Sequence, residues 1–200
     1  MHPSTLKRTS KYLSWLLRHG ANEAGLSMDK AGWAKTDDVR KLARLSPQVL
    51  DEIIATNNKT RLQVDGDRIR ANQGHSMDGT PVTLEALEDS WGVWNGSTSI
   101  WHGTQPELVL SIARAGLLAQ SRSHVHLAAS VDSRVGKRAG VGVLLEVDPA
   151  RVRAAGLPIF ISDNGVILTR RVPPDAVIAL HPLSRRARSA APKLRAALGI

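Results

Sequence analysis

The 200-residue sequence contains no cysteine, few aromatic residues and no long apolar run. The absence of cysteine excludes disulfides, thiolate metal sites and cysteine nucleophiles, and it favours a cytoplasmic protein. Because there are five Trp but only one Tyr and one Phe, stacking on bases is not expected to be the main binding device. No run approaches the ~20 apolar residues of a membrane span, and the charged first residues lack the apolar segment of a signal peptide. We therefore expect neither a leader nor a membrane partner.

Positive charge is concentrated at the two ends of the sequence. Residues 1–80 carry 13 Lys and Arg against 9 Asp and Glu, whereas residues 81–184 carry 9 of each. The tail 185–200 has five basic residues and no acidic residue. This distribution favours a polyanionic partner, nucleic acid before membrane, although a solvated basic surface gives the same pattern.

The first part of the chain predicts three helices and a hairpin. Helices are expected after the capping or starting residues Ser4, Thr36 and Ser46. The first helix is expected to end at Gly20 as a C-terminal cap, which places Arg18-His19 in its last turn. Strand-like runs on either side of Asp65-Gly66 predict a hairpin about a tight turn. Three helices followed by a hairpin indicate a winged-helix-like lobe.

The second part of the chain changes to short strands and short helices. A helix that starts at Pro106 should end at Gly116, and Asp148-Pro149 should open another that ends at Gly156. Asn164-Gly165 is expected to be a hairpin turn. The strand-like segments are Val125–Ala128, Val141–Val147, Pro158–Ile161, Val166–Thr169 and Ala176–Leu180. The fold class predicted is α+β, with a mixed, largely antiparallel sheet in this part.

These patterns predict a domain organisation in four parts. They are a winged-helix-like lobe (1–76), a connector with a short helix at Leu84–Leu87 (77–100), a sheet-containing lobe (101–184) and a basic tail (185–200). The tail has apolar residues at helical spacing, so both an amphipathic helix and a disordered segment remain open.

Several polar segments could carry chemistry. His124-x-His126 has no third metal ligand in sight, since Asp132 lies six residues on, and we expect no metal. The Arg18-His19 pair could compensate a helix dipole or bind an anion. Arg61 is either a solvated strand residue or part of a site. Glycines on both sides of Lys137-Arg138 could bring a guanidinium close to a ligand, or could mark a flexible loop.

Taken in order, these segments resemble one family, the NAD-dependent RNA (tRNA) 2'-phosphotransferases, from about Lys11 to Leu180. The segments that carry the resemblance are Leu16-Leu17-Arg18-His19, Gly32-Trp33, Lys59-Thr60-Arg61-Leu62, Ile69–Ser76, His102-Gly103-Thr104, His124-Val125-His126-Leu127, Val135-Gly136-Lys137-Arg138 and Asn164-Gly165-Val166. Small departures from the family's usual residues occur at Thr60, Leu62 and Ala128.

The resemblance implies an N-terminal winged-helix-like lobe that binds RNA and a C-terminal ADP-ribosyltransferase-like lobe that binds NAD as co-substrate. The catalytic set that it implies is Arg18, His19, Arg61 and Arg138. The NAD-binding residues that it implies are His102, Gly103, Thr104, His124 and His126, although the last two could instead be structural histidines. Asn164 is expected in a turn rather than in contact with a ligand.

The family reaction removes an internal 2'-phosphate from RNA and needs no general base to activate its phosphate nucleophile. The resemblance implies an ADP-ribosylated RNA phosphate as intermediate, with 2'-hydroxyl RNA, nicotinamide and ADP-ribose 1'',2''-cyclic phosphate as products. Arginine suits such a site because its planar fork pairs with phosphate and stays charged. Two alternatives remain: an ADP-ribosyltransferase acting on terminal nucleic-acid phosphates or on protein, and a non-catalytic nucleic-acid-binding module. We expect a monomer that has RNA carrying a 2'-phosphate as its partner in tRNA splicing.

Overall fold

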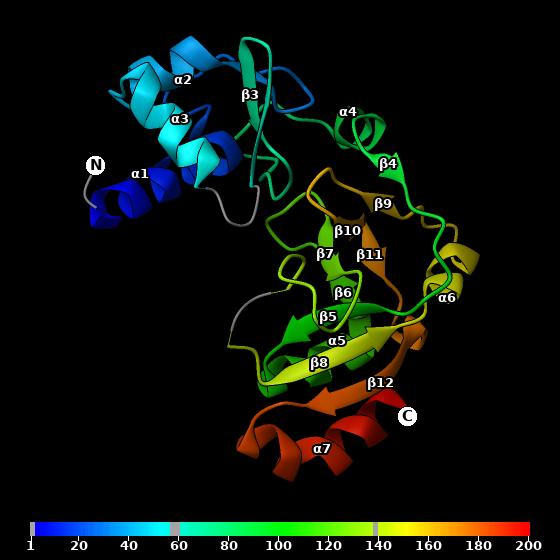
Figure 1. Cartoon of the computed structure of the whole chain (residues 1–200). Coiled ribbons are helices and arrows are strands. Elements are labelled where there is room, and N and C mark those ends of the chain that lie inside the picture. The colour runs from blue at the N-terminus through cyan, green and yellow to red at the C-terminus, as the bar shows by residue number, and fades with distance from the viewer. Residues whose placement is uncertain (1–2, 57–60, 138–139) are drawn as a thin grey trace. The chain divides into compact units, whose positions relative to one another are not determined.

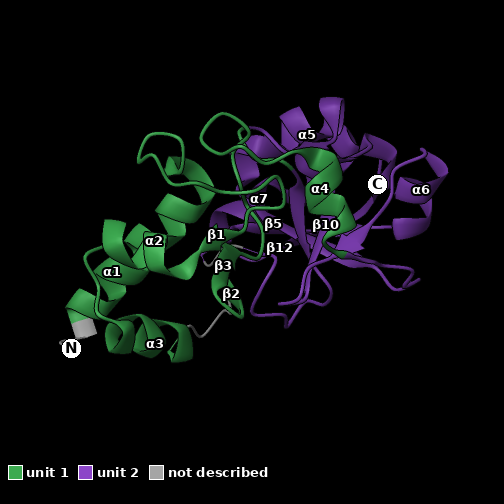
Figure 2. Ribbon diagram, turned by 90° about the horizontal axis from the view of Figure 1, so that it is seen from above, with its two compact units in different colours: residues 1–91, 121–123 green, residues 92–120, 124–200 purple. Residues whose placement is uncertain are grey.

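The computed structural model describes residues 3–56, 61–137 and 140–200 (Figure 1). The chain folds into two units: residues 1–91 with 121–123 form unit 1, and residues 92–120 with 124–200 form unit 2 (Figure 2). The fold is mixed α+β, and every strand pairing within the described ranges is antiparallel. Across these same ranges, no helix combines the length and apolar character needed to cross a bilayer.

Unit 1 combines helices with a small sheet. Its elements are α1 (Pro3–Trp15), η1 (Leu16–Gly20), β1 (Ala34–Lys35), α2 (Thr36–Leu42), α3 (Pro47–Ala55), β2 (Leu62–Asp65), β3 (Arg68–Ala71) and α4 (Leu84–Asp89). The strand order is β1-β3-β2. The three predicted helices are confirmed, and Ser46 caps α3 by accepting the amide of Val49 at 3.4 Å. Apolar side chains from α1, η1, α2, α3 and the sheet form one core.

Two details of unit 1 differ from the sequence-based expectation. Gly20 is not a left-handed cap, because Ala21 keeps helical dihedral angles and the first positive φ comes at Gly25, at 65°. A Cβ at Gly20 would instead overlap the indole of Trp15, and this contact accounts for the glycine. The hairpin turn lies one residue later than predicted, because Asp65 pairs with Arg68 across the loop.

Unit 2 is built around a larger sheet. Its elements are β4 (Gly92–Val93), β5 (Ile100–Thr104), η2 (Pro106–Leu108), α5 (Val109–Ala115), β6 (Leu117–Leu118), β7 (Val125–Ala128), β8 (Val143–Val147), α6 (Pro149–Ala154), β9 (Phe160–Ile161), β10 (Val166–Thr169), β11 (Arg171–Val172), η3 (Pro174–Ala176), β12 (Val177–Pro182) and α7 (Arg185–Leu198). The seven-stranded sheet has the order β12-β8-β5-β7-β10-β9-β4, and β11 pairs with β6. The predicted strands are confirmed, but the central strand β5 was not predicted.

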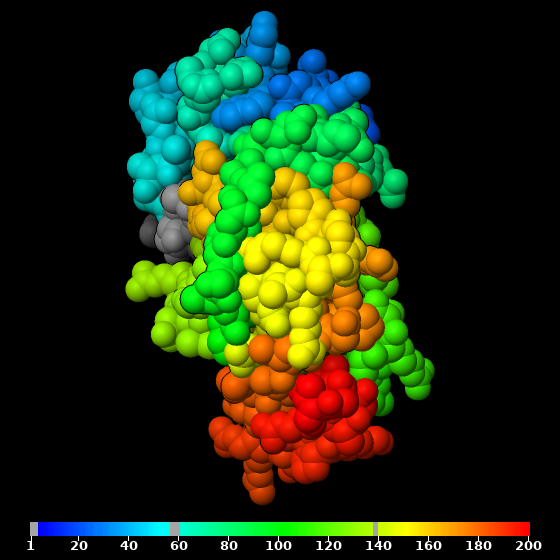
Figure 3. Space-filling model, turned by 90° about the vertical axis from the view of Figure 1, so that its right-hand side faces the viewer, coloured from blue at the N-terminus to red at the C-terminus, as the bar shows by residue number. Residues whose placement is uncertain are grey.

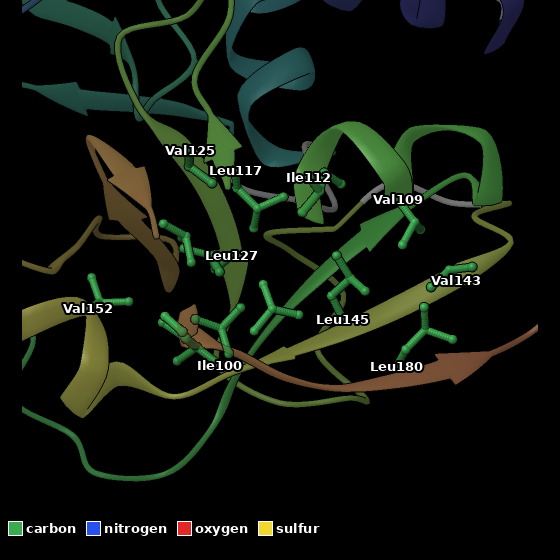
Figure 4. Packing of buried hydrophobic residues seen from close by; sticks show 14 of the residues in the cluster. Ile100, Val109, Ile112, Leu117, Val125, Leu127, Val143, Leu145, Val152 and Leu180 are labelled. Atoms are coloured by element: carbon green, nitrogen blue, oxygen red, sulfur yellow. The ribbon is translucent and has the colours of Figure 1, made fainter. Parts of the chain in front are cut away.

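Branched aliphatic side chains fill the space between this sheet and the helices of unit 2. Figure 4 shows side chains of α5 and of strands β5, β7 and β8 pointing toward one another: Val109, Ile112, Ile100, Leu127, Val143 and Leu145. Asp148 caps α6 by accepting the amide of Ala150 at 2.7 Å, as expected. The Asn164-Gly165 turn between β9 and β10 is confirmed, and Gly165 has a φ of 79°.

Two surface segments of unit 2 are fixed by side chains. Arg153 of α6 donates to the carbonyls of Trp94 and Gly96 at 3.1 and 2.7 Å. Figure 3 shows the segment around residues 92–99 (green) running beside α6 (yellow). The basic tail forms α7, which packs beside β12 and α5 through Ala187, Ala191 and Leu194. Of the two alternatives for the tail, the helix is confirmed and the disordered segment is wrong.

Candidate active site

Arg18 and His19 lie in η1, a turn of π-helix that continues α1. Such turns alter the regular helical hydrogen bonding and are frequent at functional sites. The Arg18 carbonyl accepts the backbone amide of Ser76 at 2.8 Å. Gly79 packs so closely on the His19 carbonyl that a Cβ at residue 79 would overlap it. Residues far along the chain therefore fix the position of this turn.

Arg61 precedes β2 directly and is half-buried. Its carbonyl accepts the amide of Asn72 at 2.9 Å, which extends the β2–β3 pairing by one hydrogen bond. The polar segment after β3 is buried, with His75 at 0% exposure. Arg61 is thus held against the same segment, residues 72–76, that contacts η1.

A third arginine, Arg122, joins unit 1 from a distant part of the sequence. Arg122 and Ser76 form an isolated antiparallel bridge, and the amide of Ser123 donates to the carbonyl of His75 at 2.9 Å. The sequence analysis did not single out Arg122. Its one signal was its place two residues before His124 of the His-x-His motif.

The three arginines and His19 form a cationic cluster. Burial, followed by the charges of Arg61 and Arg122, lowers the pKa of Arg18 from its ordinary value to about 10. Burial, followed by Arg18 and Arg122, also lowers the pKa of His19 from its usual 6.5. Within the described ranges, the buried Nε of Arg18 has no hydrogen-bond partner. Since Arg18 remains charged at neutral pH, an anion would complete this cluster.

Other motif residues of unit 1 build the scaffold. Gly32 has a φ of 86°, and a Cβ there would lie 2.7 Å from Nε2 of the buried His75. The Trp33 ring has the guanidinium of Arg68 at 5.0 Å and that of Arg70 at 4.5 Å from its centroid. Arg70 is only 3% exposed and donates through Nη1 to Ser90 at 2.8 Å. The Gly32-Trp33 motif is therefore explained by packing.

In unit 2, His102, Gly103 and Thr104 belong to β5, between β8 and β7. The Nδ1 atom of His102 lies 3.1 Å from the His126 carbonyl oxygen, which fixes the ring against β7. A Cβ at Gly103 would lie 3.0 Å from a methyl group of Val141, so the backbone is closely covered there. Thr104 is 6% exposed. The motif thus occupies a tightly packed end of a central strand.

The two histidines of the His-x-His motif differ in environment. His124 lies just before β7, is 1% exposed and meets the ring of Phe160 edge-on at 6.3 Å between centroids. His126 lies within β7 and is half-buried. This contrast favours a structural role for His124 and leaves His126 the more accessible of the two.

Arg138, the fourth residue of the implied catalytic set, lies outside the described residues. The two residues before it are described. Gly136 has a φ of 77°, and a Cβ there would overlap the carbonyl of Leu127 in β7. The Cβ of Lys137 lies 3.5 Å from the point where a Cβ of Gly103 would stand. The loop that leads to Arg138 is therefore fixed to β7 and β5.

The chemistry that these side chains offer is the binding of an anion. Arginine forks pair with phosphate oxygens in two parallel hydrogen bonds, and a neutral imidazole can accept a proton. In the part of the chain that the structure describes, no three His, Asp or Glu side chains gather as a metal site would require. Asn164 accepts a hydrogen bond from Ser162 Oγ at 2.8 Å within its turn.

An α+β protein with such an arginine and histidine cluster is suited to the class of enzymes that act on phosphate esters. The sequence profile described as "RNA 2'-phosphotransferase, Tpt1 / KptA family" matches residues 4–171. The chain therefore belongs to this family, whose members are transferases that remove a 2'-phosphate from RNA with NAD as acceptor.

Individual relatives agree with the profile. The chain is 39% identical over 171 residues to a protein of Rhizobium rhizogenes named "Probable RNA 2'-phosphotransferase", covering 82% of this chain and 88% of the relative. A Pseudomonas syringae protein of the same name is 40% identical over 82% of this chain and 89% of its own length. An Acaryochloris marina protein, also of that name, is 35% identical over 84% and 93%.

Proposed function

We propose that this chain transfers an internal 2'-phosphate from RNA to NAD, giving 2'-hydroxyl RNA, nicotinamide and ADP-ribose 1'',2''-cyclic phosphate. One observation carries the proposal within unit 1: Arg18 is desolvated beside Arg61 and Arg122, and its buried Nε lacks a partner among the described residues. Like charges held together out of water destabilise the protein unless an anion binds between them. A phosphate monoester is such an anion.

In the first step, Arg18 and Arg61 bind the 2'-phosphate and orient one oxygen toward C1'' of the nicotinamide ribose. A bond forms between that oxygen and C1'', and the bond from C1'' to the nicotinamide nitrogen breaks. Nicotinamide leaves with the electron pair of that bond. Because the phosphate is already anionic at neutral pH, this step needs no general base. The cluster of arginines and His19 accordingly contains no carboxylate that would act as one.

In the second step, the 2''-hydroxyl oxygen attacks the phosphorus, and the bond from phosphorus to the RNA 2'-oxygen breaks. The proton of the 2''-hydroxyl must reach the departing 2'-oxygen. His19, whose pKa is lowered from 6.5, is neutral at pH 7 and can accept that proton and deliver it. The arginines hold the charge on the nonbridging oxygens, and preorganised donors of this kind contribute about 3–4 kcal/mol each.

For unit 2 we propose the NAD-binding role, with Arg138 as the fourth catalytic residue. The support is the set of polar residues His102, Thr104 and His126 on the adjacent strands β5 and β7, where Nδ1 of His102 lies 3.1 Å from the His126 carbonyl oxygen. Gly103 belongs to the proposed set through the family motif alone, because Val141 covers its backbone. His124 is the weakest member of the proposed NAD set because it is 1% exposed.

The finer fold descriptions also belong to the proposal. Three helices followed by the β2–β3 hairpin support a winged-helix-like RNA-binding unit 1. The antiparallel seven-stranded sheet supports an ADP-ribosyltransferase-like unit 2. Action as a monomer in the cytoplasm, without a membrane partner, stays a prediction.

The direct test is to incubate the protein with NAD and a short RNA bearing one internal 2'-phosphate, and to identify the products by mass. We expect 2'-hydroxyl RNA and ADP-ribose cyclic phosphate. Transfer of ADP-ribose to a terminal phosphate without cyclic phosphate would instead indicate an ADP-ribosyltransferase. If the folded protein consumes neither reactant, the proposal is wrong.

Single variants then assign the steps. His19→Ala should accumulate ADP-ribosylated RNA phosphate if His19 serves the second step, and Arg138→Ala should lose turnover. Lys193→Ala, an exposed cation of α7, is the matched control and should keep full activity. Near-normal phosphate removal by either of the first two variants would remove that residue from the catalytic set.

A further inference from the structure

The outward face of α1 carries the two exposed aromatic side chains of the protein. Tyr12 and Trp15 are each 38% exposed, whereas the remaining Trp and Phe side chains, all within the described ranges, are buried or half-buried. The two rings lie 5.8 Å apart between centroids, at an interplanar angle of 30°. Exposed Tyr and Trp are enriched at binding interfaces, because each combines a large apolar ring with a polar edge. The pair therefore offers one continuous aromatic surface to a partner.

This aromatic surface adjoins the turn that carries the cationic cluster. Arg8, Tyr12 and Trp15 are spaced by four and three residues, so they lie along one side of the helix. Leu13, on the other side, is 0% exposed and packs in the core of unit 1. The indole of Trp15 lies over Gly20, the last residue of η1, where a Cβ would overlap the ring. A ligand held at η1 therefore has the aromatic pair directly beside it.

Cations flank the aromatic pair without anions to balance them. Helix α1 contains Lys7, Arg8 and Lys11 and no Asp or Glu, and all three basic side chains are exposed. The ion pairs found within the described ranges involve other residues. Cations beside exposed rings are the combination that binds single-stranded nucleic acid, because the cations hold the phosphates and the bases stack on the rings. A lipid surface fits less well, since the apolar face of α1 is already buried in the core.

We infer that bases flanking the 2'-phosphorylated nucleotide stack on Tyr12 and Trp15, while the three cations of α1 hold the phosphates of that strand. This inference rests on the proposed function and adds a second RNA-binding surface to unit 1. The partner is a single-stranded segment, because bases within a duplex have no free face to stack on a protein ring. Stacking tolerates every base, so the surface selects unpaired RNA and does not read its sequence.

The test compares two short RNAs that carry one internal 2'-phosphate and have the same backbone phosphates. In one RNA the nucleotides on both sides of the 2'-phosphate have their bases, and in the other both are abasic. For the wild-type protein we expect the dissociation constant to rise about 5- to 150-fold when the bases are removed, the range for one stacked base. For Trp15→Ala and Tyr12→Ala the two RNAs should bind within about twofold of each other. Fluorescence anisotropy of end-labelled RNA measures these constants.

Further variants separate stacking from structural effects. Trp15→Phe keeps an aromatic ring and should keep part of the base effect, and Tyr12→Ala, one turn further from η1, covers the case in which Trp15→Ala displaces that turn. Leu42→Ala removes a 39% exposed apolar side chain of α2 and should keep the wild-type ratio. Lys11→Ala should weaken both RNAs equally and reduce the salt slope of binding by about 1, whereas Arg114→Ala, an exposed cation of α5, should not.

Each remaining outcome decides against the inference or against the proposed function. Equal binding of the two RNAs by the wild-type protein, or a base effect that survives in both alanine variants, would overturn the inference alone. If the aromatic pair instead joins two copies of the chain, Trp15→Ala would change the sedimentation coefficient and leave the base effect unchanged, which overturns it as well. If the wild-type protein converts neither RNA to 2'-hydroxyl product, the proposed function itself has failed.

Discussion

Gly79 lies directly against the backbone carbonyl of His19, so closely that a Cβ on residue 79 would overlap the carbonyl oxygen. The carbonyl of Gly79 in turn accepts the amide of Asn22, two residues beyond the end of η1, at 3.1 Å. These two contacts fix the position of the π-turn that carries Arg18 and His19. The geometry of the cluster therefore depends on a residue that has no side chain.

The first prediction follows from these contacts. Gly79→Ala must displace η1, so we expect a loss of about 1–3 kcal/mol in the free energy of unfolding, typical of overpacking, and a fall in kcat/KM of more than tenfold. Thermal melts and the RNA assay measure the two effects. Gly25→Ala is the control: it has a positive φ of 65° but open space around it, so it should lose stability and keep activity. Equal activity of the two variants would show that η1 tolerates the displacement.

The second prediction concerns the cost of the charge on Arg18. Its pKa in the folded protein is about 10, below the ordinary arginine value, so folding disfavours the charged form at every pH below about 10. Arg18→Met keeps the volume and removes the charge. We expect it to raise the free energy of unfolding by about 1–2 kcal/mol at pH 7, after allowance for solvent screening, while abolishing phosphate removal.

The effect of inorganic phosphate on the melting temperature tests the same electrostatic cost at Arg18 in a second way. Added inorganic phosphate should raise the melting temperature of the wild-type protein, because it binds the native cluster, and should have little effect on Arg18→Met. If phosphate stabilises both proteins equally, the anion binds elsewhere. If Arg18→Met is less stable than the wild type, packing by the arginine stem outweighs the cost of its charge.

Much of the fold could be predicted because its signals are local. Ser46 and Asp148 cap helices as expected, and Asn164-Gly165 turns where the strands on either side require it. The central strand β5 escaped prediction because burial along it does not alternate: Ile100, Gly103 and Thr104 are buried, whereas Trp101 and His102 between them are half-buried. The π-turn at η1 escaped because contacts from residues 76 and 79, distant in sequence, impose it.

The candidate site shows the same division between local and distant signals. Arg18, His19 and Arg61 were predicted from motifs, and the structure brings Arg18 within electrostatic reach of Arg61. Arg122 could not be predicted in this way, since its role depends on pairing with Ser76, 46 residues earlier in the chain. The burial of His124 could not be predicted either. The alternation of His124 and His126 along a strand is equally consistent with an exposed strand face and with a buried one.

The third prediction concerns the titration of His19. Burial and then the charges of Arg18 and Arg122 lower its pKa from 6.5, so the imidazole should titrate below that value in the free protein. Folding disfavours the protonated form, so the stability tied to neutral His19 is present above pH 6.5 and is lost as the pH falls. NMR of the histidine ring would follow this midpoint directly. A bound phosphate should move it upward, because an anion stabilises the imidazolium.

His181 provides the contrast within the same spectrum. It lies 3.1 Å from Glu146 in unit 2, outside the cationic cluster, so inorganic phosphate should leave its signal in place. A His19 midpoint above 6.5 in the free protein, or one that phosphate does not move, would contradict the electrostatic description of the cluster.

The fourth prediction tests the loop that leads to Arg138. Gly136 and Gly140 both have a positive φ, 77° and 70°, so alanine meets the same kind of backbone strain at each position. Only at Gly136 would the added Cβ also overlap the Leu127 carbonyl, whereas Gly140 has nothing within 4 Å. Gly136→Ala must therefore move the backbone away from β7, and Lys137 with it.

If that loop positions Arg138 for reaction with NAD, Gly136→Ala should lower kcat for nicotinamide release at least tenfold. Gly140→Ala should keep kcat within about twofold of the wild type, while its backbone strain lowers stability by roughly 1 kcal/mol. Single-turnover assays with 2'-phosphorylated RNA would separate the two steps. Equal kcat values for the two variants would mean that the contact with β7 does not govern catalysis, and Arg138 would then have to be positioned by other residues.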